Sequence, residues 1–135
     1  MGNFKNLRVW QDAMTLTEEV YKITNYSSFH RDFGLKDQLR RAVVAIASNI
    51  AEGDERDSNR QSVYFLQISK GSTAEVITQL NIAHRLGYIN ADKLYELENL
   101  AEKIRASLKN LIKARGGDNP VKVISWFILS LFLPL

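Results

Sequence analysis

Apolar residues recur at helical spacing along most of the chain. Residues 7–25, 35–53, 58–87 and 90–115 each carry apolar positions that follow one another at intervals of three and four, which predicts four amphipathic helices. The first segment has two adjacent apolar rows, Ala13, Leu16, Val20 and Ile23, and Trp10, Met14, Thr17 and Tyr21. Together these rows form an apolar face wider than one helix–helix contact requires.

The other three segments show a main apolar row each, and these rows predict the core. The rows are Leu35, Leu39, Ala42, Val43, Ile46, Ala47 and Ile50; Phe65, Ile68, Ser72, Val76, Leu80 and Ala83; and Leu94, Leu97, Ala101, Ile104, Leu108 and Leu111. Ser58 and Asn90 are predicted N-caps, and Gly53 and Gly87 are predicted to end helices. The short connections favour antiparallel neighbours. The predicted fold is all-α, an up-down-up-down antiparallel four-helix bundle.

Two stretches lie outside this pattern. Tyr26, Phe29 and Phe33 in the connection at 26–34 are expected to tuck under the bundle. Residues 1–115 are predicted to form the bundle domain, and 116–135 a Gly-rich stop followed by an apolar C-terminal extension. Three interpretations of the extension stay open: a segment packed on the bundle or a neighbouring subunit, a non-native or read-through terminus, and a membrane or partner anchor.

Composition narrows the class of protein. The chain has 135 residues, of which 45% are hydrophobic and 24% charged, values typical of one folded domain. It has no cysteine, which excludes disulfides, thiol nucleophiles and Cys-ligated zinc. The N-terminus has no secretory pattern, and the apolar run at 123–135 is shorter than the ~20 residues that a membrane span needs. We therefore expect a soluble, cytoplasmic protein with no membrane partner.

The sequence carries no catalytic motif. A di-iron bundle needs Glu-x-x-His pairs, but Asn81 and Ser27 stand three residues before the two histidines, His84 and His30. No nucleophile elbow and no phosphate-binding glycine loop is present. We expect no metal, no cofactor and no enzymatic activity.

Five polar residues are predicted to have structural roles. Asn49 continues the second apolar row and is expected near the interior, where one polar residue fixes register. Glu52 lies in the last turn of its helix, where its charge needs a local partner such as a backbone donor or an arginine of the next turn. A hairpin register that places Ile46 opposite Phe65 sets Glu75 beside Lys36 and Arg40, which predicts an ion pair.

The net charge of +3 can be assigned to one end of the bundle. The antiparallel layout brings Lys5 and Arg8 and the turn near residue 56 beside the basic end of the last helix. Phosphate contacts are predicted, at low specificity, for Arg56, Arg60, Lys109, Lys113 and Arg115. Part of this charge simply complements a helix dipole, and a solvated face is the alternative interpretation. Since no aromatic residue is interleaved with these basic residues, base-specific recognition is not indicated.

A series of short motifs adds a resemblance. In order, they are Phe4-Lys5-Asn6-Leu7, Val9-Trp10-Gln11, Gly34-Leu35, Gln38-Leu39-Arg40-Arg41-Ala42, Asn49-Ile50-Ala51-Glu52-Gly53, Gly71-Ser72, Ala74-Glu75, Thr78-Gln79-Leu80 and Leu86-Gly87-Tyr88. Over about residues 4–115 the chain resembles the 23S rRNA intervening-sequence proteins, also called the S23 ribosomal protein family. Some members are encoded inside bacterial 23S rRNA genes. The accessory protein of diversity-generating retroelements is similar in fold and binds nucleic acid and a reverse transcriptase.

This resemblance implies an assembly more than a reaction, because the family forms toroidal homopentamers of four-helix subunits. The expected function is that of a non-enzymatic homo-oligomer, a pentamer, that binds RNA or DNA through phosphate contacts. The alternative is a scaffold or adaptor that binds another protein and has no nucleic-acid role. Salt dependence of nucleic-acid retention separates the two.

Overall fold

A computed structural model describes residues 2–117, which form helices and turns and no strand. The four long helices are α1 (Arg8–Ile23), α3 (Phe33–Glu55), α4 (Asn59–Arg85) and α5 (Ala91–Ala114). Two short elements complete the described chain, a 3-10 turn η1 (Phe4–Asn6) and the helix α2 (Ser27–Arg31) between α1 and α3. The predicted all-α class is confirmed.

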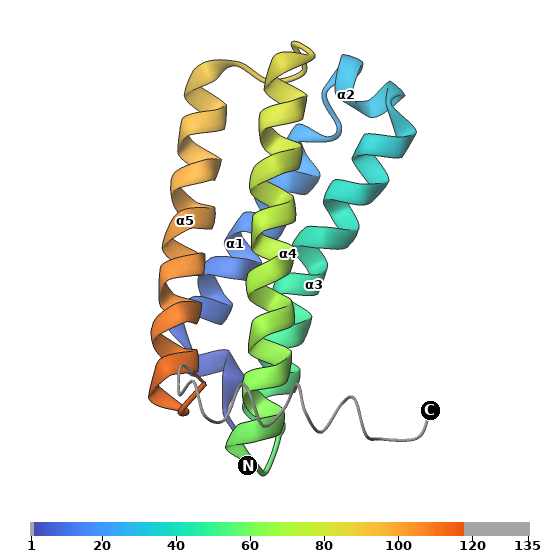
Figure 1. Cartoon of the computed structure of the whole chain (residues 1–135). Helices are drawn as coiled ribbons and strands as arrows, with labels where there is room; N and C mark the ends of the chain where they lie inside the picture. Colours follow the sequence, from blue (N-terminus) through green and yellow to red (C-terminus); the bar gives the residue numbers. More distant parts are fainter. Residues whose placement is uncertain (1, 118–135) are drawn as a thin grey trace, which may run out of the picture.

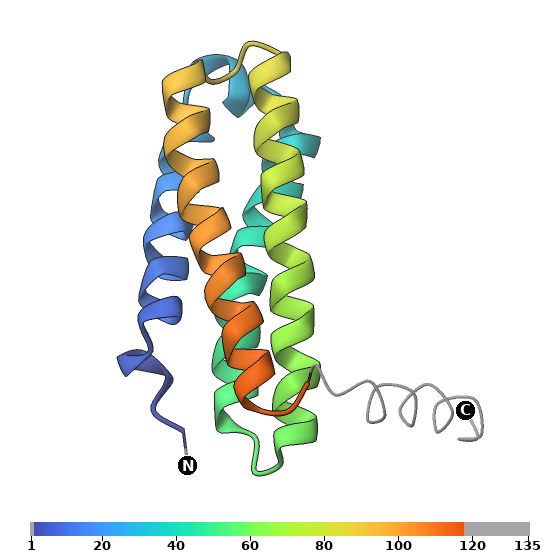
Figure 2. The same ribbon diagram turned by 60° about the vertical axis from the view of Figure 1, so that its left-hand side comes forward.

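The long helices pack side by side, and successive ones run in opposite directions (Figures 1 and 2). α1 packs against α3 and α5, and α4 packs against the same two helices, so α1 and α4 occupy opposite corners of the bundle. The N-terminal segment, the α3–α4 turn and the end of α5 therefore meet at one end (Figure 1). The α4–α5 turn and α2 lie at the other end.

Side-chain caps fix where the helices begin. Ser58 Oγ accepts from the Gln61 N–H (3.1 Å) and Asn90 Oδ1 from the Lys93 N–H (2.8 Å), as predicted. Asp32 caps α3 in the same way through the Leu35 N–H (3.1 Å). Gly87 follows α4 with a φ of 80°, a conformation that residues with a β-carbon rarely adopt, so the predicted stop is confirmed there.

The predicted core rows of α1, α3 and α5 are largely buried. Buried apolar residues of these helices are Val9, Ala13, Leu16, Val20, Ile23, Leu39, Ala42, Val43, Ile46, Ala47, Ile50, Leu97, Ala101, Ile104, Leu108 and Ile112. Leu35, Leu94 and Leu111 lie at the core's margin. Of the second row of α1, Trp10 packs against the core, whereas Met14 and Tyr21 remain 38% and 40% exposed.

The predicted core row of α4 is wrong at its first two positions, Phe65 and Ile68, whereas Ser72, Val76, Leu80 and Ala83 are buried as predicted. Phe65 is only partly buried and Ile68 is 38% exposed, whereas Leu66, Ser69 and Thr73 are fully buried. The Ser69 hydroxyl donates to the Ile46 carbonyl (2.8 Å). Ile46 therefore lies one helical turn further along α4 than the predicted register placed it. Small side chains with hydrogen-bonded hydroxyls let α3 and α4 approach closely. A search for apolar positions does not detect a contact of this kind.

Two other expectations are corrected. Gly53 does not end its helix but is buried within α3, where a β-carbon would stand 3.1 Å from the Leu66 side chain and from the Ser62 carbonyl. Of the connection's aromatics, Phe29 is buried as predicted, but Tyr26 and Phe33 are 48% and 65% exposed. The predicted apolar extension lies outside the described residues.

The close α3–α4 contact leads to a test of stability. Ser69→Val should lower the free energy of unfolding by about 1–3 kcal/mol, because it removes the bond to Ile46 and adds volume to a tight contact. Urea unfolding of the variant measures this change. Ser48→Val, an exposed position of α3, is the matched control and should change stability by less than about 0.5 kcal/mol. Equal stability of the two variants would contradict the close packing.

Candidate nucleic-acid interface

The basic end of the bundle is where the N-terminal segment, the α3–α4 turn and the last turn of α5 meet (Figures 1 and 2). All five predicted phosphate-contacting residues lie on elements that reach this end or adjoin it: Arg56 after α3, Arg60 in the first turn of α4, Lys109 and Lys113 in α5, and Arg115 after it. The structure divides them into two groups according to what their side chains contact.

Arg115 is engaged inside the protein. Its guanidinium donates from Nη1 to Ser62 Oγ (2.6 Å) and from Nη2 to Asp54 Oδ1 (3.1 Å). The Arg115 side chain is 22% exposed and that of Asp54 is 9% exposed. This Arg115 clasp joins the end of α5 to the α3–α4 turn. Arg115 is therefore a structural residue here, which the sequence did not indicate because its partners lie more than fifty positions away.

Arg56 is also held by its neighbours. Its Nη2 donates to Glu52 Oε2 (2.8 Å), and its guanidinium lies 4.5 Å from the centre of the Phe65 ring. The prediction that an arginine of the following turn partners Glu52 is confirmed. Stacking on Phe65 leaves Arg56 40% exposed but fixes its position.

Lys109 and Lys113 belong to the second group. They stand four residues apart on α5, so they share a face, and both are exposed. Within residues 2–117 neither of them forms an ion pair, while Lys103 and Arg105 earlier in the helix contact Asp12 and Glu102. These two lysines are the predicted site residues whose charge is directed to solvent.

The register of α4 against α5 adds Lys70 to this group. Asn81 Nδ2 donates to Glu98 Oε1 across the two helices (3.1 Å). Lys70 and Lys109 each lie three helical turns from that contact, in the direction of the basic end. They are therefore level with each other across the α4–α5 groove. Lys70, which forms no ion pair among the described residues, was missed because it lies inside α4 rather than at its end.

Arg60, Lys70, Lys109 and Lys113 together form what we call the basic row. Its members come from the outer and α5-facing sides of α4 and from the neighbouring face of α5. Like charges on adjacent helices repel one another, and a row of this kind is stabilised by a bound polyanion. The row is the feature of the basic end that can contact phosphates.

The predicted structural residues have different surroundings from those expected. Asn49 is half-buried and donates to the Ala45 carbonyl of its own helix (2.8 Å). The predicted ion pair of Glu75 is wrong: among the described residues Glu75 has no ion-pair partner and lies exposed in the α3–α4 groove beside Gln38. The ion pair is absent for two reasons. The predicted register of α3 against α4 is wrong, and the two expected partners are oriented away from Glu75.

Both expected partners of Glu75 turn toward the first part of the chain. Lys36 is 8% exposed, and its Nζ donates to His30 Nδ1 (3.4 Å). Arg40 donates from Nε to Thr24 Oγ1 (2.9 Å), and its guanidinium lies 4.4 Å from the centre of the Tyr21 ring. These contacts hold α3 to α1 and α2, so both side chains are structural.

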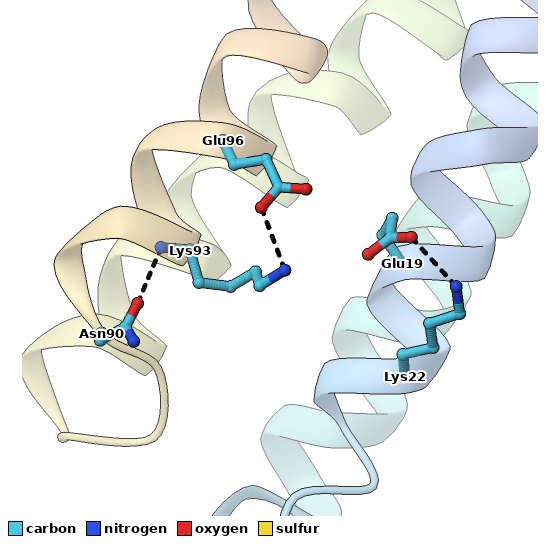
Figure 3. A network of polar contacts seen from close by, with 5 residues as sticks. All are labelled: Glu19, Lys22, Asn90, Lys93 and Glu96. Carbon is cyan, nitrogen blue, oxygen red and sulfur yellow. Dashed lines mark hydrogen bonds and ion pairs between the residues drawn. The ribbon is translucent and has the colours of Figure 1, made fainter.

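Polar groups at the opposite end are satisfied by one another. The Tyr88 hydroxyl donates to Asp32 Oδ2 (2.9 Å), and this bond, aided by burial, raises the pKa of Tyr88 above its usual value. Figure 3 shows two separate local contacts on neighbouring helices: Lys93 Nζ donates to Glu96 Oε2 (3.0 Å) on α5, and Lys22 Nζ donates to Glu19 Oε1 (3.2 Å) on α1. The bond to Glu96, with a smaller contribution from the charge of Glu19, raises the pKa of Lys93.

Residues 2–117 hold no group of three or more histidine, cysteine, aspartate or glutamate side chains arranged for a metal ion. None of its helices has the length and apolar character of a membrane span.

Comparison with known proteins agrees with the fold. The family model described as 23S rRNA-intervening sequence protein matches residues 5–110. A crystal structure of a protein of unknown function from the S23 ribosomal protein family, from Bacteroides thetaiotaomicron, superposes with a TM-score of 0.73 at 20% identity. The match covers 78% of this chain and 95% of that one. No curated protein shows significant similarity to the sequence.

The Arg115 clasp leads to a second test of stability. Arg115→Ala should lower the free energy of unfolding by about 3 kcal/mol, because it leaves the buried Asp54 carboxylate without its cation. Arg105→Ala removes an exposed pair with Glu102 and should cost less than about 1 kcal/mol. Urea unfolding measures both variants. If Arg115→Ala costs no more than its control, the clasp does not stabilise the bundle.

Proposed function

Since the chain belongs to the 23S rRNA-intervening sequence protein family, we propose that it is a non-enzymatic, cytoplasmic homo-oligomer that binds RNA or DNA through phosphate contacts. The observation that carries the nucleic-acid part is the basic row. Lys70, Lys109 and Lys113 lie on two adjacent helices and form no ion pair among the described residues. A sugar–phosphate chain offers the evenly spaced negative charge that such a row attracts.

Other cations on the surface contact carboxylates, and this difference supports the assignment. Arg115, Arg56, Lys103 and Lys93 each contact a carboxylate within 3.5 Å. Charge pairing is thus frequent on this surface, and Lys70, Lys109 and Lys113 differ in forming no ion pair among the described residues.

Two grooves support self-association. The α1–α3 groove is lined by Tyr21, Asp37, Arg40, Arg41, Val44 and Ala45, and the α3–α4 groove by Gln38, Gly71, Ala74, Glu75, Thr78, Gln79 and Ile82. They lie on different faces, as a repeated head-to-tail contact requires. Arg41 in the first groove complements Glu75 in the second. Gln79 Oε1 is buried and has no hydrogen-bond partner within residues 2–117.

Leu66, Ser69, Ser72 and Thr73 are buried inside the subunit and are not available for a partner, whereas Gly71 faces open space. Closure into a ring of five is what the family resemblance implies. The same grooves also fit the alternative function, a scaffold that holds a second protein.

Nucleic-acid binding should depend on the basic row. The double variant Lys109→Glu and Lys113→Glu should bind RNA and DNA more weakly, and the slope of log affinity against log salt should fall by about 2. Retention by the native protein should drop steeply between about 50 and 200 mM salt. Fluorescence anisotropy with a labelled oligonucleotide measures both quantities.

The matched control for this experiment carries the same charge change at the other end. Arg31→Glu with Arg85→Glu replaces two exposed cations of α2 and α4 and should leave affinity unchanged. Absence of binding by the native protein at low salt would refute the nucleic-acid role and favour the protein scaffold. Equal losses of affinity in both double variants would show that the net charge alone attracts the nucleic acid.

Assembly should be visible in the molecular mass. Multi-angle light scattering should give about five times the 15.4 kDa of the chain. Ile82→Glu places a charge in the α3–α4 groove and should reduce this mass, whereas Tyr95→Glu at a 71% exposed position of α5 should not. A native protein that remains at 15.4 kDa in micromolar solution would contradict self-association.

A further inference from the structure

We infer that Arg41 of one copy of the chain enters the α3–α4 groove of the next copy, where its guanidinium pairs with Glu75 and donates to Gln79. This inference rests on the proposed self-association, because it names the contact that joins two copies. The two grooves then have different roles, since one presents a cation and the other receives it.

Arg41 is a cation without a partner in its own subunit, within residues 2–117. α3 packs between α1 and α4, and Arg41 lies exposed on α3 at the α1–α3 groove. Asp37 stands one helical turn before it, at the spacing of a helical ion pair, yet the two described side chains form no such pair. The neighbouring Arg40 differs, because Thr24 and the Tyr21 ring hold it. Arg41 is thus the cation of this groove that is available to another copy.

The α3–α4 groove has the opposite character. Glu75 is the charged residue among its lining side chains, and it is exposed with no ion-pair partner in the described part of the chain. Gln79 lies one helical turn further along α4 and is 9% exposed. Its Oε1 is buried and receives no hydrogen bond within residues 2–117. Because a buried oxygen without a donor costs free energy, the groove needs a hydrogen-bond donor as well as a positive charge.

An arginine side chain meets both needs. Its guanidinium keeps its charge and carries several N–H donors in a fixed planar arrangement. One edge of the group can bind the Glu75 carboxylate, while the remaining N–H groups donate to the amide oxygen of Gln79 one turn away. A lysine ammonium offers a point charge without this geometry. The chemistry of the groove therefore calls for an arginine.

Small side chains open the α3–α4 groove to another helix. Gly71, Ala74 and Thr78 line it at intervals of three and four. A β-carbon added at Gly71 would meet no atom within 4 Å, so this part of α4 is uncovered. The distance between two packed helices depends on the size of the side chains at the contact. Small residues here let the α3 helix of a second copy come close enough for its arginine to reach the groove.

Exposed apolar side chains accompany both charges. Val44, one helical turn after Arg41, is 41% exposed, and Ile82 in the receiving groove is 42% exposed. A contact between copies would remove both side chains from water and would shield the adjacent ion pair from solvent. Shielding strengthens the attraction of opposite charges and increases the penalty for like charges. The ion pair thus selects which faces meet, and burial of the apolar side chains stabilises their contact.

The test reverses each charge and then both. Arg41→Glu and Glu75→Arg should each raise the protein concentration needed for assembly about 30-fold or more, because each places like charges at the contact. The double variant should assemble as the native protein does. Multi-angle light scattering over a dilution series measures the mass, and circular dichroism verifies that helicity is kept. Arg85→Glu and Asp92→Arg reverse exposed charges beside the α4–α5 turn and are matched controls that should leave the mass unchanged.

A mixture shows whether the pair joins two copies or closes within one. When the Arg41→Glu and Glu75→Arg proteins are mixed in equal amounts, each contact between unlike copies again brings opposite charges together. The mixture should therefore reach a larger mass than either variant alone. A pair within one subunit would be restored in the double variant but not in the mixture. A mixture that gains no mass would thus overturn the inference.

Failure of this inference can be told apart from failure of the proposed function. If the native protein assembles and Arg41→Glu assembles equally well, a different contact joins the copies and the inference is wrong. A double variant that stays as dissociated as the single variants would also refute the pairing. If the native protein remains at 15.4 kDa, the proposed self-association itself fails.

Discussion

The close approach of α3 to α4 determines which side chains of α4 are exposed to solvent. Ser69 and Gly53 lie at this contact, where a larger side chain would force the helices apart. Because small residues fill the contact, the larger Tyr64 and Ile68 of α4 are turned outward. The packing of the buried face of α4 thus decides which residues lie on its exposed face.

Much of the fold could be predicted from the sequence, because most of the core follows apolar spacing. The rows of α1, α3 and α5 are buried as expected, and Ser58 and Asn90 cap their helices. α4 is the exception. Serine and threonine rank as polar in any pattern search, yet in α4 their hydroxyls bond to backbone carbonyls, such as that of Ile46, and their size suits a tight contact.

The candidate site was predictable only in part, since charge along a chain does not reveal pairing in space. Lys109 and Lys113 are exposed as a basic patch requires. Arg56 and Arg115 have the same charge but contact Glu52 and Asp54, one near in sequence and one distant. Lys70 joins the row only through the register of two helices. Local pairs can be anticipated from spacing of three or four, whereas the others depend on tertiary contacts.

The Arg115 clasp has a consequence for local motion. Helix ends normally fray with little cost, because few contacts hold the last turn. Here the residue after α5 is bonded to Ser62 and Asp54, which lie 53 and 61 positions earlier in the chain. Unwinding the last turn of α5 would also release the α3–α4 turn. Amide hydrogens of the two segments should therefore exchange with solvent together, as a single cooperative unit.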